Sequence, residues 1–395
     1  MPIVTPYIPQ NITIHLGPPD RWAENLTVSF PDYIKNVASS EIYPTWTDAA
    51  LRANILAQIS FALNRVYTEY YRSRGFDFDI TSSTAIDQKF IKGRSTFENI
   101  DRIVDDVFDS YIRRRDTVEP LAAKFCNGTT VTCEGLSQWG SEELGQQGYS
   151  SIDILRRYYG NDIELVANAP IAGIQNSYPD SPLRRGATGD YVTVLQVMLN
   201  RISQDYPAIP RIPSPDGIFG LRTENSVREF QRIFNLTPDG IVGKATWYKL
   251  VFLYVGVTDL SELTSEGQRF YEIRPTSNIA PIQEGDRGIE VMGLQYFLSI
   301  ISRVNPSFSR LSIDGIFGPV TKQSVIAAQE YLGLPPTGIV DLSTWLSIYD
   351  EYQSAAKALE RITTLPTAPQ DIKEALLSGQ FPGYDLRYGN SDERS

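Results

Sequence analysis

Glu41 is the residue of this 395-residue chain whose surroundings best suit proton-transfer chemistry. It follows a predicted helix over residues 31–40, where the negative end of the helix dipole disfavours a charged carboxylate. Ile42, Tyr43 and Trp46 come next and can shield the carboxyl group from water, which raises a carboxyl pKa. A carboxylic acid that stays protonated near neutral pH can serve as a general acid.

Histidine and cysteine are scarce, which limits the other kinds of active site. His15 is the only histidine, so a Ser-His-Asp or Cys-His arrangement is not expected. Cys126 and Cys133 enclose a short turn, and the sequence leaves free thiols, a disulfide bond and a metal-binding pair open. A zinc site needs three or four ligands and His15 lies far away in the sequence, so we expect no metal and no cofactor.

The elements that would position Glu41 indicate an α+β domain over residues 1–166. Residues 12–16 alternate between apolar and polar side chains, which predicts a strand. A long helix is expected to begin after a cap at Thr47 and to continue to about Arg72, because its apolar residues fall at helical spacing. A further helix is predicted over residues 99–115.

The second half of the chain contains an internal repeat. Residues 216–220, Asp-Gly-Ile-Phe-Gly, return as residues 314–318, and Trp247 returns as Trp345 at the same spacing of 98 residues. Self-similarity of this kind indicates one structural unit used twice. Two such units favour two-point attachment to a repetitive ligand, because tethering raises the effective concentration of the second site.

Turn residues divide the rest of the chain. Residues 167–182 hold Pro, Gly, Ser and Asn without periodicity, which predicts a linker. Residues 183–257 and 280–352 each read as helix, turn, helix, turn and helix, so both are predicted to be small all-α domains. Residues 353–395 are expected to form a C-terminal helix followed by a flexible tail.

The overall charge and the chain ends limit the partners. A net charge of −11 argues against nucleic acid, since phosphate binding needs clustered Lys and Arg. The sequence has no long apolar run, so no membrane span is expected. The first residues lack a basic start and an apolar stretch, so no N-terminal signal peptide is expected.

Each repeat resembles the peptidoglycan-binding domain type 1 family, a three-helix module. The first copy carries the motif of this family at Gly186, Gly189, Val192, Leu195, Gln196, Asp216, Gly217, Phe219, Gly220, Val227, Phe230, Gln231, Asp239, Gly240, Val242, Gly243, Thr246 and Trp247. The second copy departs from it at Thr337, which replaces Asp, at Asp341, which replaces Gly, and at Ala328, which stands in place of Phe230. The resemblance implies docking onto peptidoglycan, while the residues taken alone read as turn glycines and core aromatics.

Residues 32–165 resemble the stage II sporulation protein D (SpoIID) family, lytic transglycosylase-like proteins of the bacterial wall. The resemblance rests on residues 40–46, 50–54, 84–93, 135–140, 147–148, 154–155 and 158–159. It implies that Glu41 is the catalytic acid. We expect Asp87, Gln88, Ser137, Gln138 and Tyr158 to grip the sugar, with turn and core scaffolding as the other interpretation of these five residues. Ile59 stands where that family has an arginine, which puts one polar site residue in doubt.

The whole chain is similar in organisation to the clostridial spore cortex-lytic enzymes. This resemblance implies cleavage of cortex glycan strands with formation of a 1,6-anhydro product, a location in the spore wall, and an activating protease as a further partner. Two alternatives remain open: a non-catalytic peptidoglycan-binding scaffold, which Ile59 would favour, and a hydrolase that cuts the same glycan with water.

Overall fold

The computed structural model describes residues 6–174, 176–268, 270, 273 and 280–364. The chain divides into two compact units, Met1–Pro213 with Gly217–Gln268, and Ser214–Asp216 with Arg269–Ser395. The first unit therefore combines the N-terminal α+β region with nearly all of the first repeat, and the second unit contains the second repeat.

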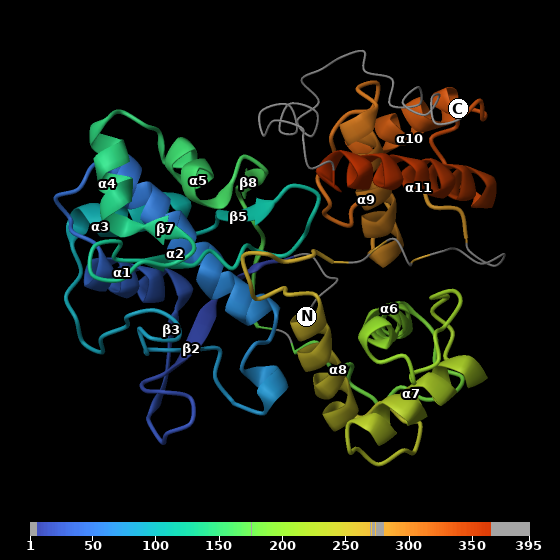
Figure 1. Cartoon of the computed structure of the whole chain (residues 1–395), viewed down its shortest axis with the longest axis horizontal. Coiled ribbons are helices and arrows are strands. Elements are labelled where there is room, and N and C mark those ends of the chain that lie inside the picture. Colours follow the sequence, from blue (N-terminus) through green and yellow to red (C-terminus); the bar gives the residue numbers. More distant parts are fainter. Residues whose placement is uncertain (1–5, 175, 269, 271–272, 274–279, 365–395) are drawn as a thin grey trace, which may run out of the picture. The chain divides into compact units, whose positions relative to one another are not determined.

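One buried helix organises the N-terminal region. This helix, α2 (Asp48–Tyr67), begins at Thr47, whose hydroxyl accepts a hydrogen bond from the Ala50 N–H. Its residues are buried on nearly every face, and the buried set includes polar side chains such as Asn54, Gln58 and Asn64. Helices α1 (Phe30–Glu41), α3 (Glu98–Val107), α4 (Gln138–Gln146) and α5 (Ser151–Tyr159) all pack against it (Figure 1).

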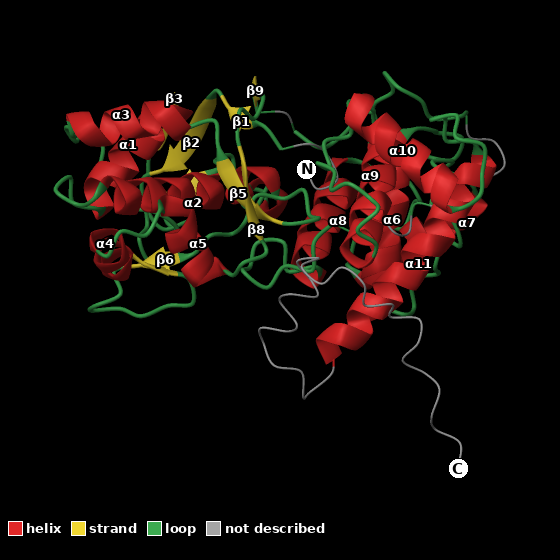
Figure 2. Cartoon of the chain, turned by 90° about the horizontal axis from the view of Figure 1, so that it is seen from above, coloured by secondary structure: helices red, strands yellow, loops and turns green. Residues whose placement is uncertain are grey.

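Short strands complete this region (Figure 2). The longest pairing joins β2 to β3 in antiparallel register, and β4 extends it in parallel. The other pairs are β5 with β8 (antiparallel), β1 with β9 and β6 with β7 (both parallel). The bounds are β1 (Ile8–Pro9), β2 (Asn11–His15), β3 (Asn25–Ser29), β4 (Ile80–Thr81), β5 (Tyr111–Arg114), β6 (Phe125–Cys126), β7 (Leu136–Ser137), β8 (Ile163–Val166) and β9 (Ile171–Ala172).

The strand predicted over residues 12–16 and the helix predicted over 31–40 are confirmed as β2 and α1, but two predicted helices end too late. The prediction that α2 continues to Arg72 is wrong, because Glu69 takes a positive φ of 48° that breaks the helix. A short 3₁₀ helix, η1 (Arg72–Arg74), follows that break. The helix predicted over 99–115 is also wrong beyond Val107, because the chain continues as β5 and pairs with β8.

The two repeats fold alike, as the sequence predicts. The first forms α6 (Asp190–Asp205), α7 (Leu221–Ile233) and α8 (Lys244–Val257). The second forms α9 (Ile289–Val304), α10 (Pro319–Tyr331) and α11 (Leu342–Thr364). A bridge between Leu183 and Val242 in the first repeat returns between Ile282 and Val340 in the second. The predicted tail after residue 364 lies outside the described residues.

Buried glutamines clamp the turns that define the repeat. The Gln231 side-chain oxygen accepts the Gly240 N–H at 2.8 Å, and its amide donates to the Asp239 carboxylate at 2.9 Å. In the second repeat, Gln329 accepts the Gly338 N–H at 2.9 Å. Both glycines have a positive φ, near 70°, which favours Gly. The repeated Gln is therefore a fold-maintaining residue.

The two departures at the last turn of the second repeat, Thr337 and Asp341, keep the same local structure. The Thr337 hydroxyl accepts from the Gln329 amide and from the Ile339 N–H, both at 3.2 Å, and so replaces the Asp239 carboxylate. Asp341 accepts the Thr344 N–H at 2.8 Å, the contact of a helix N-cap at the start of α11. Neither substitution removes a turn.

The segment predicted as a linker makes specific contacts inside the first unit. The Trp247 indole N–H donates to the Ser177 hydroxyl at 2.8 Å. The Ser177 N–H and hydroxyl both donate to the buried Glu69 carboxylate. These bonds connect the end of α2, the segment 167–182 and the last helix of the first repeat.

Candidate functional site

Glu41 is the last residue of α1, and local sequence explains why the helix stops there. Ile42 is extended, with φ −122° and ψ 159°, and its N–H closes the helix on the Ala38 carbonyl at 3.0 Å. Pro44 follows and cannot extend the helix. The chain then turns directly into the Thr47 cap of α2, so the Glu41 side chain sits at the corner between α1 and α2.

Three donors from three different segments meet the Glu41 carboxyl group. The backbone N–H of Lys89 donates to Oε1 at 2.7 Å. The side-chain amides of Gln58 and Gln138 both approach Oε2, at 3.4 and 3.3 Å. The loop around residue 89, the centre of α2 and the start of α4 therefore converge on this one group.

Burial raises the pKa of the Glu41 carboxyl from 4.5 to about 7, although the Lys89 N–H, the Gln58 amide, the Lys89 charge and the Gln138 amide all lower it. Near neutral pH this carboxyl group is therefore divided between its acid and its carboxylate form. A group in that condition can donate a proton in one step and accept one in the next.

Three aromatic residues are close in sequence to the residues of these contacts. Tyr43 follows Glu41 by two residues, Trp46 follows three residues later, and Trp139 comes directly after Gln138. Their ring centroids are 5.1 to 5.7 Å apart, so the three rings form one cluster, called here the Tyr43–Trp46–Trp139 cluster. Tyr43 is 55% exposed and Trp139 is 37% exposed, which is unusual for such large rings.

Of the five residues predicted to grip a sugar, Gln138 is the one whose side chain contacts Glu41. Ser137 caps α4 through the Gly140 N–H at 3.0 Å, and it also hydrogen-bonds the Tyr158 hydroxyl. Ser137 and Tyr158 therefore lie together at the N-terminal end of α4, next to Gln138.

Asp87 and Gln88 are instead engaged inside the protein. Asp87 accepts from Arg65, from the Tyr71 hydroxyl and from Thr81, and its side chain has no exposed surface. The Gln88 side chain accepts the Tyr33 hydroxyl at 2.8 Å and donates to the Gln58 carbonyl at 3.0 Å. Both residues precede Lys89, so their contacts hold the backbone that bonds Glu41.

The sequence analysis missed Gln58 and the Lys89 N–H. The signal for Gln58 was available, because Asn54 and Gln58 are polar residues four positions apart in an otherwise apolar stretch. Ile59, at the position of the arginine in the resembled family, has no exposed surface and belongs to the core. The Lys89 N–H had no signal, since a backbone contact does not depend on side-chain type.

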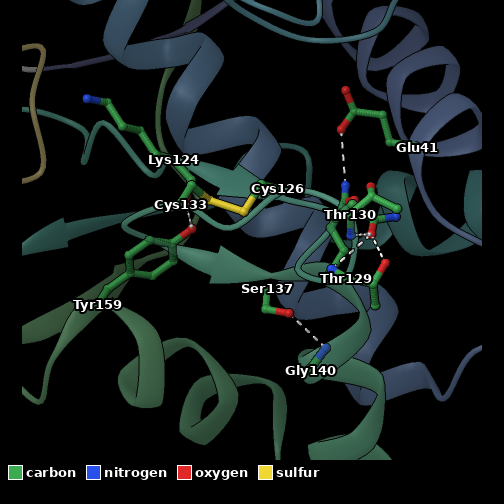
Figure 3. The surroundings of a disulfide bond; sticks show 11 residues. Glu41, Lys124, Cys126, Thr129, Thr130, Cys133, Ser137, Gly140 and Tyr159 are labelled. Atoms are coloured by element: carbon green, nitrogen blue, oxygen red, sulfur yellow. Dashed lines mark hydrogen bonds between the residues drawn. A yellow bond between two sulfur atoms is a disulfide. The ribbon is translucent and has the colours of Figure 1, made fainter.

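A disulfide bond supports the start of α4 (Figure 3). Cys126 and Cys133 are bonded, which settles the three alternatives that the sequence left open. Within the enclosed loop, Asn127 accepts the N–H groups of Thr129 and Thr130, and its carbonyl accepts the Trp139 N–H at 3.3 Å. The disulfide loop therefore helps to position Trp139 at the start of α4.

Among the described residues, no cluster of His, Cys, Asp and Glu has an arrangement that could hold a metal ion. In the same part of the chain, none of the helices combines the length and the apolar character needed to cross a membrane.

Comparison with known proteins supports the assignment of the repeats. Residues 188–250 and 288–348 each match the peptidoglycan binding domain family PG_binding_1. A curated protein of Kitasatospora aureofaciens, "Uncharacterized protein in bpoA1 3'region", is 41% identical over 69 residues, 17% of this chain and 53% of its own length. The chain therefore spans about half the length of that relative.

Among solved structures, the SleB N-terminal domain is 32% identical and covers 20% of this chain and 99% of its own, with a TM-score of 0.17. The family matches show that the chain carries two domains of the peptidoglycan-binding type, and peptidoglycan is the partner that these domains support.

Proposed function

We propose that the chain is a lytic transglycosylase that cuts the glycan strands of peptidoglycan, with Glu41 as its acid and base. The observation that carries the proposal is the Glu41 carboxyl group, whose pKa burial raises to about 7 at the point where the Lys89 N–H and the Gln58 and Gln138 amides converge on it. The two repeats would hold the polymer while this group acts on it.

In the first step, the Glu41 acid donates its proton to the glycosidic oxygen as the bond from C1 of N-acetylmuramic acid breaks. The C6 hydroxyl oxygen of the same sugar then bonds to C1, and its proton passes to the Glu41 carboxylate. The strand leaves with a 1,6-anhydro end, and Glu41 is again protonated. No water is consumed, in contrast to two-carboxylate glycosidases.

Two other carboxylates of the N-terminal region, Glu142 and Asp87, are bound to structural partners, which favours a mechanism that uses Glu41 alone. Glu142, on α4, accepts the Thr47 N–H at 2.8 Å and its hydroxyl at 2.9 Å, so it secures the start of α2. Asp87 is bound by Arg65, Tyr71 and Thr81. Both groups have structural partners, which leaves Glu41 as the carboxyl group suited to proton transfer. Gln138, with Ser137 and Tyr158 beside it, is the proposed contact for the sugar substituents.

We further propose that the N-terminal region is a SpoIID-like domain and that the chain acts like the clostridial spore cortex-lytic enzyme SleC, in the spore wall during germination, with a protease as its activator. The motifs that the sequence shares with that family support this proposal. A non-catalytic scaffold is the second candidate, because the buried Ile59 cannot supply the charge of the arginine in that family.

Mass spectrometry of the products released from purified spore cortex separates these functions. Muropeptides with 1,6-anhydro ends are the expected result. Reducing ends would mean hydrolysis by water, and sedimentation of the protein with cortex without any released product would mean a scaffold. Vegetative-wall peptidoglycan as a parallel substrate shows whether the activity depends on the cortex.

A further inference from the structure

The Tyr43–Trp46–Trp139 cluster comes from the same two segments as the Glu41 site, because Tyr43 follows Glu41 by two residues and Trp139 follows Gln138, whose amide contacts Glu41. The cluster has no part in the proton transfer described above. We propose that this cluster is a carbohydrate-binding subsite, on which a pyranose ring of the glycan strand stacks next to the bond that is cut. This inference rests on the proposed function and names residues that would place the substrate.

The exposure of the rings is the first observation. Trp46 is 8% exposed and forms the base of the cluster, whereas Tyr43 and Trp139 remain open to solvent at 55% and 37%. Large aromatic rings left exposed together lose the free energy that burial would give them, so such patches mark binding surfaces.

The geometry of the rings is the second observation. Trp139 is inclined by 45° to Tyr43 and by 63° to Trp46, so the three rings are not stacked face to face on one another. Tyr43 and Trp46 are also tilted, by 46°. Rings packed in this way can keep a face free, and a flat apolar face is what the C–H side of a pyranose ring can cover.

The polar neighbours favour a sugar over an apolar peptide or a lipid. Gln138 lies directly before Trp139 in the sequence and donates to Glu41, the carboxyl group on which Gln58 and the Lys89 N–H also converge. Apolar rings beside a few convergent polar groups are typical of small-molecule sites. A pyranose presents the matching pattern, an apolar face with hydroxyl and acetamido groups around its edge.

The connection to Glu41 sets the position of the bound ring. Tyr43 is joined to Glu41 through the corner after α1, and Trp139 is joined to it through the Gln138 amide, which lies 3.3 Å from Oε2. The Trp139 N–H is also held by the Asn127 carbonyl of the disulfide loop at 3.3 Å. Both exposed rings therefore belong to segments that also contribute to the Glu41 site, the corner after α1 and the start of α4.

The test uses the full chain and a tetramer of N-acetylglucosamine as the probe, with binding measured by isothermal titration calorimetry. Trp139→Leu keeps an apolar side chain but removes the ring, and Trp139→Phe keeps a ring. We expect Trp139→Leu and Tyr43→Ala to weaken binding by about fivefold or more, which corresponds to a loss of about 1 kcal/mol or more for each aromatic contact. Trp139→Phe should retain most of the affinity.

Trp22→Ala is the matched control, since Trp22 is 96% exposed, lies between β2 and β3 and is outside the cluster. This variant should bind the tetramer as the wild-type chain does. Wild-type affinity in both Trp139→Leu and Tyr43→Ala would overturn the subsite, as would equal losses in Trp139→Leu and Trp139→Phe.

The outcome separates the subsite from the proposed function. If the cluster variants lose affinity but the wild-type chain forms no anhydro product, the subsite stands and the transglycosylase proposal fails. If the wild-type chain forms that product and the cluster variants bind and react normally, the transglycosylase proposal stands and the subsite fails.

Discussion

The Gln138 side-chain amide lies 3.3 Å from the Glu41 carboxylate, although the two residues are separated by 97 positions in the sequence. Glu41 ends α1 and Gln138 begins α4, so two helix ends meet at this contact. Burial favours the acid form of Glu41, and the Gln138 amide favours the carboxylate form. The contact thus stabilises the carboxylate form of Glu41, which is the form that accepts a proton in the second step of the proposed reaction.

Gln138→Leu is expected to raise the pKa of Glu41 further, because it removes a donor that stabilises the carboxylate. The expected shift is upward but small, because burial, the Lys89 N–H, the Gln58 amide and the Lys89 charge all affect this pKa more than the Gln138 amide does. Titration of the chain with ¹³C-labelled glutamate, followed by NMR, measures it directly, with the Glu41→Gln variant used to assign the signal. An unchanged or lower pKa in Gln138→Leu would show that the amide does not act on Glu41.

The pH dependence of catalysis follows from the same group. If Glu41 must start as an acid, kcat/KM should fall as the pH rises through about 7, the pKa of Glu41. The alkaline limb should move upward in Gln138→Leu by the same amount as the NMR titration. A profile that stays flat through this range would contradict a role for Glu41 as the acid.

Stability should also depend on pH through Glu41. The folded chain holds this proton more tightly than the unfolded chain, since the pKa rises from 4.5 to about 7 on folding. This proton stabilises the folded chain fully at a pH below the pKa of Glu41 in the unfolded chain. The stabilisation, on the order of 3 kcal/mol, is lost as the pH rises through the pKa of Glu41 in the folded chain. The Glu41→Gln variant does not lose this stabilisation with rising pH, because glutamine does not titrate.

Urea unfolding of both proteins at several pH values tests this expectation. The stability of Glu41→Gln relative to wild type should increase between about pH 5 and pH 8. If the free energy of unfolding changed with pH in the same way for both proteins, Glu41 would not be desolvated in the folded chain.

The glutamine clamp of the second repeat predicts a large loss of stability. Gln329→Leu leaves the Gly338 N–H, the Ile339 carbonyl and two threonine hydroxyls without this partner, so it should cost about 2 kcal/mol or more. Gln323→Leu is the control, because Gln323 is exposed on the same helix, α10. Equal unfolding temperatures for the two variants would refute the clamp.

The disulfide predicts an effect of reduction. Opening the loop between Cys126 and Cys133 should lower stability by about 2 kcal/mol, the value for a loop of this size. Thermal unfolding with and without dithiothreitol measures the effect in the wild-type chain. A variant with serine at both positions should melt at the reduced wild-type temperature and should not respond to dithiothreitol, since the chain has no other cysteine.

The sequence predicted the repeats well because their motif residues make local contacts. Gln231 reaches residues 8 to 15 positions away, so one segment of sequence contains both the clamp and the turn. The site was harder to predict. Gln58 and Lys89 meet Glu41 from 17 and 48 positions away, and nothing in local spacing indicates this convergence.

Contacts with distant segments explain the other errors. Ile103, Val107 and Tyr111 share a helical spacing, yet Tyr111 belongs to β5, because Val166 of β8 pairs with it from a distant segment. Glu69 ends α2 with a positive φ, and its carboxylate accepts two hydrogen bonds from Ser177. Tertiary contacts determine where both helices end, so the spacing of apolar residues in the sequence could not predict these ends.

The most direct test of the central claim compares wild type with Glu41→Gln on purified spore cortex, with bound protein measured by sedimentation and released muropeptides measured by mass spectrometry. We predict that both proteins sediment equally, because the repeats are unchanged, and that only the wild type releases anhydro-muropeptides. Release of those products by Glu41→Gln at the wild-type rate would contradict the assignment of Glu41.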